Sequence, residues 1–70
     1  MFQMKLINFT DRDGKPVYVN PESVALLRRL KGVDRDREDT VIVFHHGGYQ
    51  VVKERIAIVS SALLSGVRPI

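Results

Sequence analysis

The chain has no cysteine, which removes two of the usual ways of stabilising a small domain. Without thiols it forms no disulfide and holds no zinc through thiolates. A cysteine-free composition also fits the reducing cytoplasm, which is the location that we expect. For so short a chain, the means of stabilisation that remains is self-association.

Long hydrophobic runs are missing as well. The longest apolar stretches, at residues 41–44 and 56–59, are far shorter than the roughly 20 residues of a membrane-spanning helix. Residues 1–8 do not resemble a secretory signal, because polar side chains interrupt the apolar ones. We therefore expect a protein that neither spans a membrane nor is exported.

With 70 residues, the chain is long enough for one domain and too short for two. Its 44% of hydrophobic and 27% of charged residues predict a folded domain rather than a disordered one. We expect a single domain over residues 1–70, with its core within about 4–64 and a frayed tail at 65–70. A core of this size is marginal, so we expect a homo-oligomer, with a dimer favoured on grounds of symmetry.

The first part of the chain predicts a β-hairpin. Residues 4–9 form a short strand candidate, and residues 15–19 form the return strand. Between them, Asp13 and Gly14 supply the positive φ that a tight turn requires. Pro16 lacks an N–H group, so it belongs at the first position of its strand or on a sheet edge.

Residues 20–31 fit either a helix or a strand. Asn20 as an N-cap, Pro21 at the first helical position and Gly32 as a C-terminal cap predict a helix over 21–31. The unbroken apolar run at 24–27 fits a buried strand equally well. Local pattern alone leaves both alternatives open.

The middle of the chain predicts a charged loop followed by a central strand. Residues 34–39 alternate in charge with no apolar member, which indicates a solvated loop. Residues 40–44 are β-branched and apolar, which is typical of a central strand. Either the side chains at 41 and 43 or those at 42 and 44 face the core. If the ring of Phe44 is fully buried, Phe44→Ala costs about 3–5 kcal/mol.

After this strand the pattern predicts a turn, a strand and a helix. Residues 45–48 turn the chain, and within them Gly47 and Gly48 suit a two-residue turn into a last strand at 49–53. Ile56, Val59 and Leu63 then recur at helical spacing, and Gly66 follows as a stop signal. This spacing predicts a C-terminal helix of about ten residues.

No group of residues in the sequence has the pattern of a catalytic or cofactor site. His45 and His46 are adjacent, so on extended backbone they point to opposite faces and do not share one metal ion. Ser60 and Ser61 fall in the predicted helix without an elbow motif, which indicates packing rather than nucleophilic roles. The glycines at 47 and 48 lack the spacing of a phosphate-binding loop. We expect neither an enzyme nor a bound cofactor or metal.

The candidate binding residues are basic and fall within ten positions of one another: Arg28, Arg29, Lys31, Arg35 and Arg37. Such a density of positive charge can neutralise phosphates, which makes nucleic acid a candidate ligand of a chain with net charge +3. Four acidic residues at 34, 36, 38 and 39 nearly cancel this charge, which favours a solvated loop instead. Tyr18 and Tyr49 could stack on bases or lie at the rim of the sheet.

Residues 4–7, 13–21, 40–43 and 49–54 resemble the small FlbD-like proteins of bacteria, which are associated with flagella and swarming. The layout also resembles a variant Sm-like barrel with five short, bent strands and a helix. In that barrel the segment after Asn20 and Pro21 is a strand, so the resemblance favours a strand at 24–31.

Together these observations predict a mainly β protein, a small five-stranded Sm-like or SH3-like barrel with a C-terminal helix. Its expected function is that of a non-enzymatic binding module, with RNA as one candidate ligand. The alternative is a protein-interaction accessory factor with a role in motility, as the FlbD-like resemblance implies. Fold resemblance by itself does not transfer function.

Overall fold

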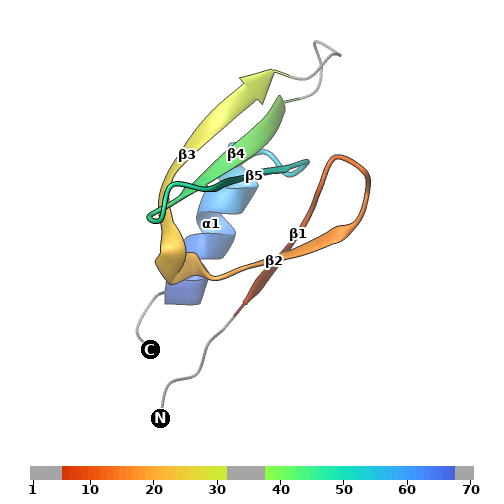
Figure 1. The fold of residues 1–70 in the computed structure, drawn as a ribbon. Helices are drawn as coiled ribbons and strands as arrows, with labels where there is room; N and C mark the ends of the chain where they lie inside the picture. The colour runs from red at the N-terminus through yellow and green to blue at the C-terminus, as the bar shows by residue number, and fades with distance from the viewer. Residues whose placement is uncertain (1–5, 32–37, 68–70) are drawn as a thin grey trace.

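The computed structural model describes residues 6–31 and 38–67, and the side chains of this part as far as Ser65. Five strands, a short 3-10 helix and an α-helix follow one another along the chain (Figure 1). They are β1 (Ile7–Thr10), β2 (Pro16–Val19), η1 (Pro21–Ser23), β3 (Val24–Lys31), β4 (Glu38–Phe44), β5 (Tyr49–Val52) and α1 (Ile56–Val67).

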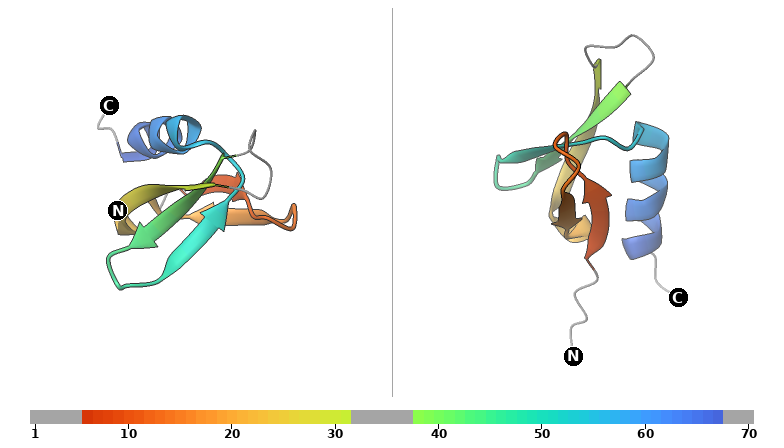
Figure 2. Two further views of the ribbon diagram at one scale, coloured as in Figure 1. Left: turned by 90° about the horizontal axis from the view of Figure 1, so that it is seen from above. Right: turned by 90° about the vertical axis from the view of Figure 1, so that its right-hand side faces the viewer.

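The strands form two antiparallel sheets, one of β1 and β2 and one in the order β3-β4-β5. The helix α1 stands behind the three-stranded sheet, and the β1–β2 hairpin lies beside both (Figures 1 and 2). The prediction of a mainly β chain with a C-terminal helix is therefore confirmed. Across the described residues the two sheets do not close into the barrel that we expected.

The first hairpin follows the predicted pairing, with Ile7 opposite Val19. Gly14 has a φ of +85°, the left-handed conformation that favours glycine, and its N–H donates to the Asp11 carbonyl at 3.1 Å. The Asp11 side chain accepts hydrogen bonds from the backbone N–H groups of Asp13 and Lys15. The chain turns at residues 11–14, as the sequence predicts, but Arg12 and Asp13 occupy the centre of the turn and only Gly14 of the predicted pair has a positive φ.

The second hairpin turns within residues 45–48 as predicted, but the centre of its turn lies two residues earlier than predicted. The N–H of Gly47 donates to the Phe44 carbonyl at 3.0 Å, so His45 and His46 occupy the centre of the turn. Gly47 has a φ of +101° and follows the turn as a bulge residue, whereas Gly48 has no positive φ. The two-residue turn at 47 and 48 is therefore wrong, because the left-handed position falls after the turn and requires only one glycine.

Between the sheets the chain turns a corner and continues as a strand. The Asn20 side chain accepts the N–H of Glu22 at 3.0 Å, and Pro21 occupies the first position of η1. Val24 is already extended, with φ −82° and ψ +124°, so the helical signals extend over a single turn. The strand favoured by the resemblance is confirmed, and pairing with β4 decides the conformation that local propensity leaves open.

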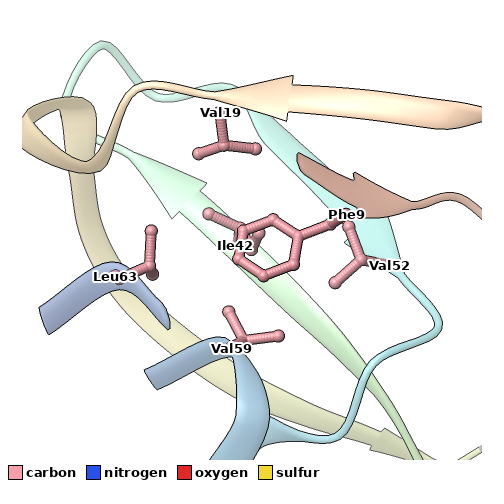
Figure 3. Close-up of a cluster of buried hydrophobic side chains, with 6 residues drawn as sticks. All are labelled: Phe9, Val19, Ile42, Val52, Val59 and Leu63. Carbon is pink, nitrogen blue, oxygen red and sulfur yellow. The ribbon is translucent and has the colours of Figure 1, made fainter. Parts of the chain in front are cut away.

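One small core lies between the two sheets and the helix (Figure 3). Its buried members come from β1, β2, β4, β5 and α1, and their side chains point toward one another: Phe9, Val19, Ile42, Val52, Val59 and Leu63. Of the two faces considered for β4, the one with Ile42 and Phe44 faces the core. Phe44 is only half-buried, stacked on His46 with ring centroids 5.5 Å apart, so the full cost of Phe44→Ala does not apply.

The helix α1 is confirmed and is slightly longer than expected. It runs through Val67 and includes Gly66, so Ser65, Gly66 and Val67 are helical rather than part of a tail. Val59 and Leu63 are its buried residues, whereas Ile58 and Leu64 are exposed. Ile58 and Leu64 are six residues apart, so they lie on different sides of the helix and flank its buried stripe.

Candidate binding surface along the edge strand

The strand β3 is an edge strand, since β4 is its only neighbour among the described strands. It has eight residues, and none of them is fully buried. A bulge between Val24 and Leu26 shifts the register, so Val24 and Leu27 both pack against the core while Ala25 and Leu26 are exposed. The unpaired edge of the sheet thus begins with an uncharged, partly exposed segment.

An apolar groove of about 240 Å³ lies beside this segment, between the start of β3 and α1. Its lining residues are apolar apart from one serine: Pro21, Val24, Ala25, Leu26, Leu27, Ser60, Leu63 and Leu64. Pockets that hold small molecules typically measure about 300–1,000 Å³, so this groove is sized for side chains rather than for a whole ligand. Leu26 and Leu64 are 42% and 63% exposed, which leaves its rim accessible.

The predicted basic residues do not form one cluster, because β3 places their side chains on both faces of the sheet. Residues that stand directly opposite each other on neighbouring strands point to the same face of the sheet. Arg28 stands opposite Val41, so both side chains lie on the face away from the core. Arg29, opposite Thr40, and Lys31, opposite Glu38, lie on the opposite face from Arg28. Of the predicted set, Arg28, Arg29 and Lys31 are all exposed, and Arg35 and Arg37 lie outside the described residues.

The acidic residues do not all belong to a solvated loop. Glu38 and Asp39 open β4, and Asp39 is only 6% exposed. Its Oδ2 accepts a hydrogen bond from Nε of Arg12 at 2.9 Å, an ion pair that joins the first hairpin to the second sheet. The loop prediction is wrong for these two residues. Sequence analysis missed this contact because Arg12 and Asp39 are 27 positions apart and only the tertiary fold brings them together.

The face of the three-stranded sheet away from α1 carries mostly apolar side chains. The register aligns them in two cross-strand rows: Leu26, Val43 and Tyr49, and Arg28, Val41 and Val51. Leu26 lies beside the bulge at the edge of the sheet, so it also borders the groove. Tyr49 is 71% exposed, and the three valines are half-buried. We call these two rows the outer face.

The other residues considered for chemistry have structural roles in this fold. His45 and His46 form the second turn, where Nδ1 of His46 accepts the Gly48 N–H at 3.2 Å. Ser60 lines the groove, and Ser61 is exposed on the helix. Within residues 6–31 and 38–67, no group of three or more potential metal ligands lies close together.

The chain was compared with protein-family models, curated proteins and solved structures, and none of the three comparisons gives a match. The FlbD-like and Sm-like resemblances therefore stay predictions. None of the described helices is long and apolar enough to cross a membrane.

Proposed function

We propose that this protein is a non-enzymatic binding module whose ligand is another polypeptide, held as an added strand along β3. The observation that carries the proposal is the edge of β3 that no other described strand covers, beside an apolar groove. An edge strand presents unpaired backbone N–H and C=O groups, which pair with a further strand. Pockets beside such an edge select the side chains of the added strand.

The distribution of charge along β3 supports this use of the edge. Lysine and arginine on edge strands commonly prevent unwanted pairing, and Arg28, Arg29 and Lys31 protect the second half of β3 in that way. The first half, with Ala25 and Leu26 exposed, has no such protection and lies beside the groove. The first half of β3 is therefore both open to pairing and next to a groove that can hold a partner side chain.

Selection from a displayed library of random peptides of about twelve residues tests the proposal. Leu64→Glu places a charge on the rim of the groove, and Ile58→Glu is its matched control, because both side chains are exposed on α1 and only Leu64 lines the groove. Selected peptides should bind Leu64→Glu at least about ten-fold more weakly, or about 1.4 kcal/mol, and Ile58→Glu nearly as well as the parent.

Peptides N-methylated at alternate positions keep their side chains but lose backbone donors, so they should also bind more weakly than the unmodified peptides. A library that yields no binder contradicts the proposal. So does a set of binders that tolerates both Leu64→Glu and N-methylation.

RNA is a second candidate ligand, favoured by the exposed cations Arg28, Arg29 and Lys31 at one end of β3. Phosphate contacts make affinity fall steeply with salt, and each contact removed flattens the salt slope by about one unit. A variant with alanine at all three positions should then bind single-stranded RNA more weakly at low salt. Unchanged binding by this variant, or no binding by the parent, excludes the RNA function.

We also propose self-association, with a dimer as the favoured state and the outer face as its contact. Two copies could bury the exposed Leu26 and Tyr49 side chains there, and the face carries one cation in its two rows. Light scattering at micromolar concentration tests this, and a mass of one chain that persists as concentration rises contradicts it.

An Sm-like barrel remains our proposal for the finer fold. What supports it is the order of five strands and a helical corner, together with a 2.7 Å hydrogen bond from the Lys53 N–H to the Thr10 carbonyl, which links the end of β5 to the end of β1. A cytoplasmic location and an FlbD-like role in motility likewise stay proposals, supported by the cysteine-free composition and by the sequence resemblance.

A further inference from the structure

We infer that the strand bound along β3 is acidic in its first half and apolar in its second half, and that it runs antiparallel to β3. This inference rests on the proposed function and adds the chemical class and the direction of the partner. It follows from the distribution of side chains along β3, where residues 24–27 are uncharged and residues 28–31 carry the positive charge.

The two halves of β3 offer different surfaces to a partner. Residues 24–27 are uncharged and line the groove with Leu63 and Leu64 of α1. Residues 28–31 hold three exposed cations and the half-buried Leu30. A partner strand lying along the whole edge therefore meets apolar surface over one half and positive charge over the other.

The positive half has little acidic compensation in the described part of the chain. Asp39 stands opposite Leu30 in the ladder, but its side chain is already paired with Arg12 of the first hairpin. Glu38 stands opposite Lys31 in the ladder, whereas Arg28 and Arg29 stand opposite Val41 and Thr40. The two arginines thus have no carboxylate directly across the β3–β4 ladder.

An added strand can supply these carboxylates on the other side of β3. Each opposite-charge pair across neighbouring strands contributes a factor of about two to five in affinity, and exposed pairs are screened by salt. Two or three such pairs amount to roughly a ten-fold preference for an acidic segment over a neutral one. A hydrophobic side chain in the groove adds apolar burial, which salt does not screen.

The direction follows from the sheet to which the strand is added. Both neighbouring pairs of this sheet are antiparallel, and antiparallel pairing is slightly more stable per residue than parallel pairing. In that direction the start of the partner lies beside residues 28–31 and its end beside residues 24–27. The acidic residues therefore precede the apolar ones.

The probe is a peptide of about ten residues with glutamates in its first half at the three positions that lie opposite Lys31, Arg29 and Arg28, and with leucine and valine in its second half. One comparison peptide carries glutamine in place of glutamate, one carries lysine, and one has the two halves in reverse order. Fluorescence anisotropy at low and at high salt measures their affinities. The acidic peptide should bind roughly ten-fold more tightly than the glutamine peptide at low salt, with the advantage shrinking as salt rises.

Charge exchange in the protein provides the matching test. Arg28→Glu with Arg29→Glu should abolish the preference for the acidic peptide and create a preference for the lysine peptide. Arg55→Gln is the control, because Arg55 is an exposed cation that precedes α1 and is not part of β3. Circular dichroism of each variant should match that of the parent, since the side chains at 28 and 29 are exposed and their loss leaves the core intact.

Failure of this inference can be told apart from failure of the proposed function. Library peptides that bind through the groove but show no acidic preference would overturn the inference and leave the proposed function standing. A tighter reversed peptide would overturn the direction. In the free protein, slow hydrogen exchange of the β3 amides that point away from β4, together with a dimeric mass, would show that a second copy occupies the edge and would overturn both.

Discussion

The substitution Ile42→Val removes one methylene from the centre of the core. Ile42 is fully buried on the central strand β4, and it lies among side chains from both sheets and the helix. Burial of one methylene is worth about 0.8 kcal/mol, and Ile→Val in a core costs about 0.5–1.5 kcal/mol once the residual cavity is included. In a domain of 60–100 residues each kcal/mol lowers the melting temperature by roughly 4–8 °C.

Thermal unfolding followed by circular dichroism, with urea unfolding as a second measure, detects a change of this size. The matched control is Ile58→Val, the same deletion at a residue of α1 that is 57% exposed and lies outside the groove. We expect Ile58→Val to change the free energy of unfolding by less than about 0.5 kcal/mol. An Ile42→Val that costs no more than Ile58→Val would show that Ile42 is not in the core and that β4 turns its other face, with Val41 and Val43, inward.

Three further substitutions test contacts that hold the two sheets and their turns. Thr40→Val removes the hydroxyl that donates to the Glu54 carbonyl at 2.7 Å, and urea unfolding should show a loss of about 1–3 kcal/mol because the acceptor is left unpaired. Arg12→Ala leaves the buried Asp39 without its partner and should cost about 1–3 kcal/mol by the same assay, less than for a fully buried pair because Arg12 is 53% exposed. Gly47→Ala forces a left-handed φ on a residue with a Cβ, and a thermal melt should show a loss of about 1–2 kcal/mol, with Gly47→Asn losing less. No measurable change for one of these substitutions would contradict the contact or backbone strain that it tests.

Much of the strand order could be predicted because its signals are local. Gly14 marks the first turn, Pro16 opens β2, and the β-branched run after Asp39 forms the centre of the second sheet. The corner at Asn20 and Pro21 was also recognised from its capping pattern. These features depend on the φ that each residue prefers and on neighbouring hydrogen bonds, both of which the sequence states directly.

The candidate site could be predicted only in part, because it depends on which residues become neighbours. The sequence pointed to Arg28, Arg29 and Lys31 as exposed cations, but alternation along a strand separates Arg28 from Arg29. The groove has no signal in the sequence, because Leu26 and Leu64 are 38 positions apart and meet only when α1 packs beside β3.

By itself the sequence determined where the chain turns, though not which residues occupy the centre of each turn, together with the β-rich composition and the periodicity of the C-terminal helix, since each follows from short-range sterics and from hydrophobic spacing. Tertiary structure alone decided that 24–31 is a strand, that Ile42 rather than Val41 faces the core, and that Asp39 is buried against Arg12. In all three cases local preferences are nearly balanced. Pairing with β4 and removal of apolar surface from water between two sheets and a helix supply the free energy that selects one outcome.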